Sequence, residues 1–164
     1  MELMKHFEVL LKDLPEACQM NYGKRLISLV VFGSVGRHLP KPDSDIDLLL
    51  IVDPLPEGRL HRVEEFGNVE HRLSDALKRA RNSGIHTRFS PVFKTPDEAR
   101  KGSPLLLDMI EDSVVLIDRE GFFQSMMTGL KERLDRLGAH RVWRGDVWYW
   151  DLKPDFKPGE VFDL

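Results

Sequence analysis

Two apolar runs joined by a short loop constrain the fold of this chain more than any other feature. The runs are Leu26–Phe32 (LISLVVF) and Ile46–Val52 (IDLLLIV). Both are continuous and rich in branched residues, a pattern typical of strands buried on both faces. The residues between them, 33–44, are rich in glycine, proline and serine and must form a loop or a short helix. The sequence therefore predicts two buried strands joined by a short connection.

Several further elements are predicted from the spacing of apolar residues. Helices are expected over 2–14, with a second short piece from Pro15 to about Tyr22; over 58–82, as one long amphipathic helix; over 96–111, in two pieces near prolines; and over 122–137, ended by Gly138. Strands are expected over 85–93 and 114–117. Pro91 places the first of these at a sheet edge or at a bulge.

The last part of the chain differs in kind. Residues 141–152 alternate around a central Arg-Gly-Asp, which predicts a β-hairpin. We therefore divide the chain into a domain over 1–137 and a C-terminal appendage over 138–164. The appendage holds all three tryptophans among several arginines, so it could be a recognition surface for a protein or nucleic acid. An aromatic hairpin packed on the core is the favoured interpretation, because cross-strand aromatic pairs commonly stabilise hairpins.

Composition excludes some classes of protein. Hydrophobic residues make up 41% of the chain and charged residues 31%, which is typical of a folded domain. A net charge of −3 gives no general attraction for nucleic acid or an anionic membrane. Cys18, the only cysteine and an expected core residue, rules out an intrachain disulfide and zinc sites of several cysteines. The apolar runs are too short to span a bilayer and no signal peptide is evident, so we expect a cytoplasmic protein without a membrane partner.

The loop after the first apolar run suits a phosphate. Gly33 and Gly36 would let the backbone approach a ligand closely, and N–H groups at a following helix start favour an anion. The Ser34 hydroxyl can donate to a phosphate oxygen, and Arg37 adds positive charge. These four residues predict a nucleotide-binding loop. The alternative is an ordinary strand-to-helix connection.

Two carboxylates accompany the second apolar run. Asp45 and Asp47 are two positions apart, so on a strand they project from the same face. Paired carboxylates beside a phosphate loop suit Mg²⁺, which prefers oxygen ligands and completes its shell with substrate phosphates. Residues 43–45 could instead form a turn or a cap. Two aspartates within an apolar strand nevertheless favour a metal or a basic partner, because buried carboxylates need a counter-charge.

The spacing of these residues resembles a family signature. Gly33-Ser34 is followed, after ten residues, by Asp45-Ile46-Asp47, which resembles the GS-x₁₀-DxD signature of the DNA polymerase β-like nucleotidyltransferase superfamily, in particular its minimal (MNT) members. The resemblance covers about residues 22–118. It implies an α/β (α+β) fold in which helices flank a small mixed sheet with antiparallel pairs. The hairpin would lie outside this core.

The resemblance also implies an activity. Gly33 and Ser34 would bind the phosphates of a nucleoside triphosphate, while Asp45 and Asp47, the catalytic residues, would hold Mg²⁺, with two ions expected. The product would be a hydroxyl group of a protein or small molecule carrying a nucleoside monophosphate. Minimal members often serve as antitoxins that modify a HEPN-type toxin, so a HEPN-type protein partner is expected, and a nucleic-acid partner is not favoured.

One departure from the family pattern leaves an alternative open. The superfamily usually carries a third carboxylate on the strand after the long helix, where it helps to deprotonate the acceptor. The corresponding stretch here, 85–93, has no Asp or Glu, and Arg88 or Ser90 takes that place. Loss of a general base typically costs about 10²–10⁴-fold in rate. The alternative function is therefore a catalytically weakened module that binds nucleotide or a partner.

Overall fold

The core of the protein is a four-stranded mixed sheet. The computed structural model describes residues 2–145 and 147–162. The strands are β1 (Leu26–Phe32), β2 (Ile46–Val52), β3 (Phe89–Lys94) and β4 (Val114–Asp118), in the order β3-β2-β1-β4. β1 is antiparallel to β2 and β4, whereas β2 and β3 are parallel. This is the mixed sheet that the family resemblance predicts.

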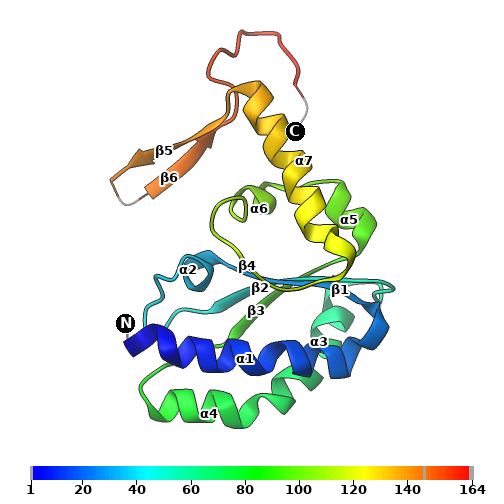
Figure 1. Cartoon of the computed structure of the whole chain (residues 1–164), viewed down its shortest axis with the longest axis vertical. Helices are drawn as coiled ribbons and strands as arrows, with labels where there is room; N and C mark the ends of the chain where they lie inside the picture. Colours follow the sequence, from blue (N-terminus) through cyan, green and yellow to red (C-terminus); the bar gives the residue numbers. More distant parts are fainter. Residues whose placement is uncertain (1, 146, 163–164) are drawn as a thin grey trace.

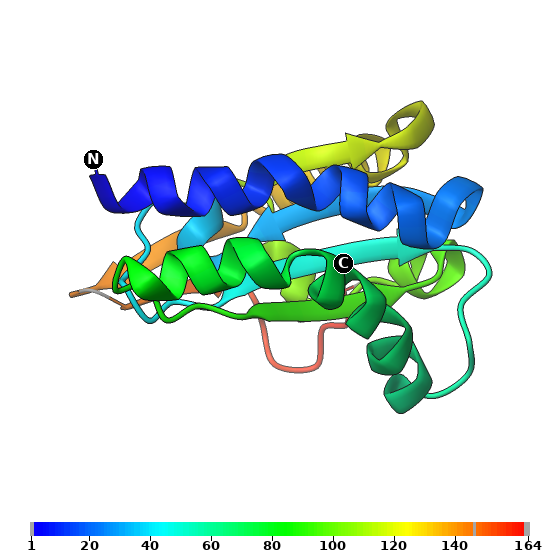
Figure 2. The same cartoon turned by 90° about the horizontal axis from the view of Figure 1, so that it is seen from below.

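Helices cover both faces of this sheet (Figures 1 and 2). On one face lie α1 (Glu2–Tyr22), α3 (Arg59–Arg72) and α4 (Ser74–Asn82). On the other lie α5 (Pro96–Arg100), α6 (Pro104–Leu107) and α7 (Phe122–Leu137). The turns η1 (Gly23–Arg25) and η2 (Arg119–Gly121) precede β1 and α7. The sheet is thus the middle of three layers.

The central strands have apolar side chains on both faces, as the continuous runs predict. Val31 and Leu48 pack into the cluster beneath α1, α3 and α4, whereas Val30, Leu49 and Ile51 pack into the cluster beneath α5, α6 and α7. All five are fully buried. Cys18 is also buried in the first cluster, as expected for a core residue.

The first helix differs from the prediction of two pieces meeting at Pro15. α1 is continuous, with Pro15 inside it. Proline lacks the N–H that would complete an interior turn and usually breaks a helix. Here Leu10 and Leu14 before the proline and Cys18 after it are all buried in one cluster. Packing of this single apolar face against the core holds the two halves in line.

The prediction of one long helix over 58–82 is wrong, because the chain bends at Leu73. This residue has φ −93° and ψ 4°, outside the helical region. Its N–H donates to the carbonyls of both Val69 (3.1 Å) and Glu70 (3.2 Å), a tightened end of α3. The Leu73 side chain is 4% exposed and lies in the core. Burial of this side chain fixes the bend between α3 and α4.

The third strand is shorter than the predicted 85–93. β3 begins at Phe89, and the residues before it pair with the loop ahead of β2. The His86 N–H donates to the Pro42 carbonyl (2.7 Å), and the Ile46 N–H donates to the Arg88 carbonyl (2.8 Å). β3 lies at a sheet edge, where Pro91 was expected. In the stretch 96–111, α5 and α6 form as two pieces, but 108–111 lie outside helices.

The C-terminal residues form the predicted hairpin. β5 (His140–Arg144) pairs antiparallel with β6 (Val147–Asp151), and Asp146 in the turn lies outside the described residues. Gly138 ends α7 in the left-handed conformation, at φ 70°. The hairpin projects from the end of α7 above the end of the sheet that carries the short helix α2 (Gly33–Gly36) (Figure 1). Among the described residues, no helix has the length and apolar character needed to cross a bilayer.

The tryptophans of the hairpin fit both interpretations in part. Trp150 packs against the core cluster beneath α7, as a structural hairpin requires. Trp143 is 58% exposed and Tyr149 is 45% exposed, so the hairpin also presents aromatic surface.

Candidate nucleotide and metal site

A four-residue helix, α2 (Gly33–Gly36), turns the chain from β1 toward β2. Gly33 has φ +68°, a conformation that other L-residues rarely adopt. A Cβ atom at Gly33 would lie 2.1 Å from Oδ2 of Asp47, which is an impossible contact. A glycine is therefore required for this carboxylate to lie directly against the start of α2.

The other end of α2 is equally tight. A Cβ atom at Gly36 would lie 2.9 Å from the Asp112 carbonyl oxygen and 3.0 Å from that of Val31. The Arg37 N–H donates to the Gly33 carbonyl (3.1 Å), and the Leu39 N–H donates to that of Ser34 (2.9 Å). The loop is thus fixed between β1 and the segment that precedes β4. Ser34 and Arg37 are both partly exposed at this point.

The two predicted carboxylates lie beside this loop. Asp47 is paired in register with Phe32, the last residue of β1 before Gly33. By strand alternation, Asp45 and Asp47 point to the face of the sheet that carries Leu49, and both are partly exposed. Burial raises the pKa of Asp47, and nearby Asp45 adds to the rise, while Ser90 and Arg37 oppose it. A cation at this place would relieve the cost of that charge.

The neighbouring strand brings no third carboxylate to the pair. Ser90 lies opposite Asp47 in the parallel register, and its hydroxyl lowers the pKa of that carboxylate. The Arg88 Nε donates to both oxygens of Asp45, at 3.2 and 3.1 Å. The two residues that sequence analysis named for the place of the third carboxylate therefore contact the two aspartates.

The donor set fits a magnesium–nucleotide complex better than a metal held by protein alone. In the part of the chain that the structure describes, no group of three or more His, Cys, Asp or Glu residues is placed to hold a metal ion. Magnesium is commonly bound by one or two carboxylates together with substrate phosphates. Asp45 and Asp47 supply the carboxylates, and the loop beside them is where phosphates would lie.

Sequence analysis did not place Arg141, Asp112 or Asp108 near this site. Arg141 on β5 is only 9% exposed, and its Nη1 donates to Oδ2 of Asp112 (2.8 Å). The guanidinium lies 4.3 Å from the centre of the Trp148 ring. Burial raises the pKa of Asp108, against the effects of Arg37 and Arg141. The pairing of 112 with 141 has no local sequence signal, apart from an arginine among tryptophans.

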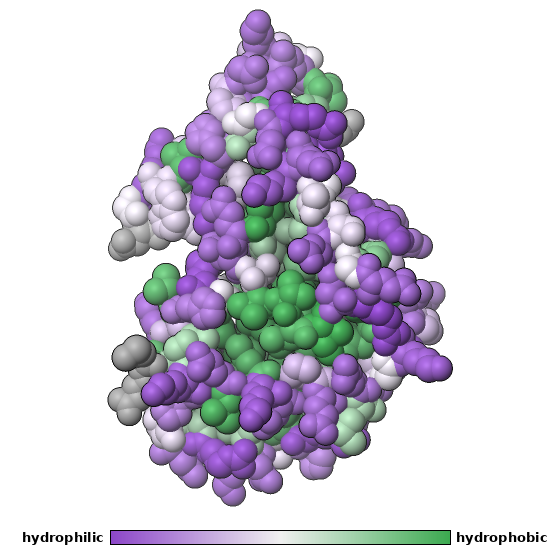
Figure 3. Space-filling view, in the orientation of Figure 1, coloured by the Kyte–Doolittle hydropathy of each residue, from purple (hydrophilic) through white to green (hydrophobic). Residues whose placement is uncertain are grey.

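The hairpin is thereby tied to the segment that backs α2. Asp112 touches Gly36 through its backbone and Arg141 through its side chain. The space-filling view shows a hollow between the hairpin and the lower body at this end (Figure 3). Ser34, Asp45 and Asp47 are each partly exposed, so solvent reaches the loop and both carboxylates.

A sequence comparison shows the family of this chain. The family model described as "Nucleotidyltransferase domain" matches residues 11–117, well over half of the chain. The chain belongs to the nucleotidyltransferase domain family. The matched residues include α2, β2 and β3, so every predicted site residue of the nucleotidyltransferase domain lies within the match.

The individual proteins to which this nucleotidyltransferase domain is similar share only a small part of its sequence. A Methanocaldococcus jannaschii protein, provisionally named a protein adenylyltransferase, is 26% identical over 130 residues, which cover 78% of this chain and 83% of the relative. A toxin–antitoxin crystal structure with AMP-PNP has 16% identity and a TM-score of 0.45, covering 82% of this chain and 92% of the other. A tri-AMPylated Shewanella oneidensis HEPN toxin in complex with an MNT antitoxin has 12% identity and a TM-score of 0.44, covering 80% and 92%.

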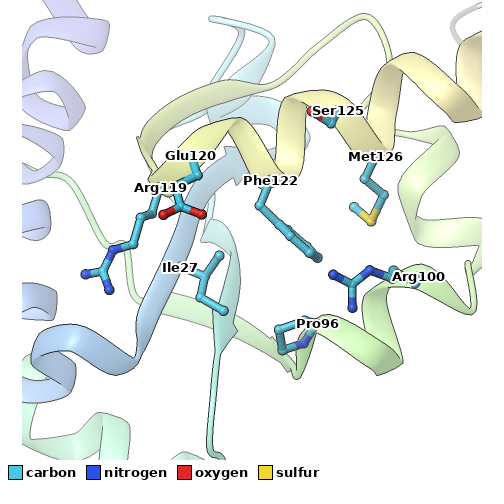
Figure 4. A pocket seen from close by; sticks show the side chains of 8 residues that line it. All are labelled: Ile27, Pro96, Arg100, Arg119, Glu120, Phe122, Ser125 and Met126. Carbon is cyan, nitrogen blue, oxygen red and sulfur yellow. The ribbon is translucent and has the colours of Figure 1, made fainter.

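A separate pocket of about 560 Å³ lies at the opposite end of the sheet of the nucleotidyltransferase domain (Figure 4). Ile27 at the start of β1 and Arg119 after β4 line it, and Arg100 is stacked over Phe122 at 4.9 Å. Among the described residues, those that line the pocket include none of the predicted site residues. The residues predicted to bind nucleotide and metal therefore lie at the α2 end of the sheet and not in this pocket.

Proposed function

We propose that this protein is a Mg²⁺-dependent nucleotidyltransferase that transfers a nucleoside monophosphate from a nucleoside triphosphate to a hydroxyl acceptor. The observation that carries the proposal is the placement of Asp45 and Asp47 on one face, with Asp47 against Gly33. A carboxylate pair next to a tight glycine loop is the arrangement that a metal-bound triphosphate needs. Family membership supports the same reaction.

Each residue has a distinct part in this proposal. Gly33 lets the backbone and the Ser34 hydroxyl approach the phosphates, and Arg37 adds positive charge beside them. Asp45 and Asp47 would hold the magnesium. Bound there, the ion would stabilise negative charge on the transferred phosphate and on the departing pyrophosphate. The fixed loop geometry orients the triphosphate before reaction, and this positioning lowers the barrier.

We propose a protein hydroxyl as the acceptor and ATP as the donor. This extends to the chain what the name of the M. jannaschii relative says of that protein. A HEPN-type toxin is the particular protein acceptor that the family resemblance predicts. Both aspartates are partly exposed, which is compatible with a macromolecular acceptor.

The test is transfer of label from the α-phosphate. The protein is incubated with Mg²⁺ and α-³²P-labelled ATP, GTP, CTP or UTP, with and without a HEPN-type protein from a neighbouring reading frame. We expect ATP to label a tyrosine, serine or threonine of that protein. The Asp45→Asn and Asp47→Asn variants should abolish the label. Labelling that survives both substitutions would contradict the proposal.

A second candidate function rests on the composition of β3. Ser90 and Arg88 stand where a third carboxylate would act as a base, which favours a module that binds Mg-nucleotide but transfers it slowly or not at all. Tight nucleotide binding without transfer to any acceptor tested would establish this second function.

A further inference from the structure

Among the described residues of β3 and of the segment just before it, only Arg88 has a cationic group that contacts a predicted metal ligand. The contact follows from backbone geometry. Asp47 faces Ser90 in register, and the Ile46 N–H donates to the Arg88 carbonyl (2.8 Å), so Asp45 lies beside Arg88. Strand alternation then directs Arg88 and Ser90 to the same face as the aspartates.

The Arg88–Asp45 contact leaves the Arg88 guanidinium free to bind a further anion. Nε of Arg88 is shared between both carboxylate oxygens, so the contact leaves the terminal Nη donors of the guanidinium outside it. The Arg88 side chain is 80% exposed, whereas that of Asp45 is 33% exposed. An ion pair this exposed stabilises the protein little, so the guanidinium can readily adjust to a new anionic neighbour.

Among the described residues, the site offers two carboxylates and no third acidic or imidazole side chain as a ligand for a second divalent ion. Asp45 and Asp47 supply two negative charges, and Arg37 and Arg88 supply two positive charges. Ser90, the neighbour of Asp47, is neutral and adds no charge where a third carboxylate would add one. A guanidinium beside the triphosphate can neutralise part of its negative charge, which is a role that a second divalent ion would otherwise have.

We propose that Arg88 serves as the second cation of this site. With Nε held on Asp45, its Nη groups would bind an oxygen of the triphosphate, and one divalent ion per nucleotide would complete the site. The inference rests on the proposed function and replaces the expectation of two metal ions. It makes Arg88 a binding residue for the nucleotide as well as a partner of Asp45.

The test counts metal ions per bound nucleotide. The full-length protein is dialysed to equilibrium against Mn²⁺ and, in turn, the α,β-methylene analogues of ATP, GTP, CTP and UTP. Retained Mn²⁺ and nucleotide are then measured. We expect a ratio of one. A ratio of two would overturn the inference and leave the proposed function standing, whereas retention of none of the four analogues would overturn the proposed function and this inference with it.

Three variants test the role assigned to Arg88. Arg88→Ala should weaken nucleotide binding at saturating Mn²⁺ by about tenfold or more, because a charge-assisted hydrogen bond is lost. Arg81→Ala removes an exposed arginine from α4 on the opposite face of the sheet and should leave the affinity unchanged. The double variant Arg88→Ala/Ser90→Asp should raise the metal ratio to two. Equal affinities for Arg88→Ala and Arg81→Ala, with both variants folded by circular dichroism, would contradict the assignment.

Discussion

Gly33 links the backbone of α2 to the chemistry of the site. Its φ of +68° and the 2.1 Å that would separate an added Cβ atom from Oδ2 of Asp47 act together. The first property concerns backbone strain and the second concerns the position of a carboxylate. A substitution here therefore has two consequences, and a suitable control can separate them.

Gly33→Ala should lower the affinity for Mg-nucleotide by about tenfold or more, because Asp47 must move away from the loop, while the backbone strain costs about 1–2 kcal/mol of stability. Gly84→Ala is the matched control: φ there is +82°, and a Cβ atom would meet nothing within 4 Å. It should cost similar stability and leave affinity unchanged. Calorimetric titration and thermal unfolding of both variants measure the two effects. Equal affinities would show that the position of Asp47 does not depend on Gly33.

At the scale of elements, apolar periodicity predicted the strands and helices, but the ends of these elements depend on contacts distant in sequence. The buried runs of β1 and β2 carry their own signal, because all their residues except Ser28 and Asp47 are apolar whichever face they occupy. The bend at Leu73 carries none, since the apolar period continues through it. Likewise, the glycine loop and paired aspartates form a recognisable local pattern, whereas the Arg88–Asp45 contact depends on parallel pairing of strands 43 residues apart.

Helix α5 shows how an ion pair adds pH dependence to a local element. Glu98 accepts from the Thr95 N–H (2.9 Å) in a capping box, and Nη1 and Nη2 of Arg62 donate to its two oxygens (2.8 and 2.9 Å). Hydrogen bonding to Arg62 lowers the pKa of Glu98 to about 2, from 4.5. A lowered pKa stabilises the folded state above pH 4.5, and this stabilisation disappears as the pH falls toward 2.

Glu98→Gln keeps a capping side chain but removes its charge. We expect the wild-type protein to exceed this variant in unfolding free energy by about 1 kcal/mol at pH 7, since the pair is partly exposed. The difference should shrink steadily between pH 4.5 and pH 2. Urea unfolding at several pH values measures it. A difference that is constant over this range would refute the role assigned to the Glu98 charge.

At the scale of the whole molecule, Arg141 joins the hairpin to the body of the protein. Its guanidinium pairs with Asp112 and stacks on Trp148. The same Asp112 backs Gly36, so attachment of the hairpin and support of the α2 loop share one residue. The hairpin is therefore expected to unfold separately only when this attachment is broken.

Arg141→Gln should destabilise the protein by about 2 kcal/mol, less than for a fully buried pair, because Asp112 keeps some exposure to water. Hydrogen exchange should accelerate in β5 and β6 and remain slow in β1 and β2. Arg144→Gln, an exposed arginine on the same strand, should change stability by less than about 0.5 kcal/mol. If both variants accelerate exchange in the hairpin equally, Arg141 is not its attachment point.

Every functional proposal for this protein depends on residues 33–47 forming a magnesium–nucleotide site, and calorimetric titration with α,β-methylene-ATP measures whether they do. We expect binding by the wild-type protein with Mg²⁺, and a loss of at least about tenfold in affinity when Mg²⁺ is removed or when Asp45→Asn or Asp47→Asn is introduced. Binding of equal strength with and without Mg²⁺, unaffected by either substitution, would show that these residues do not form such a site.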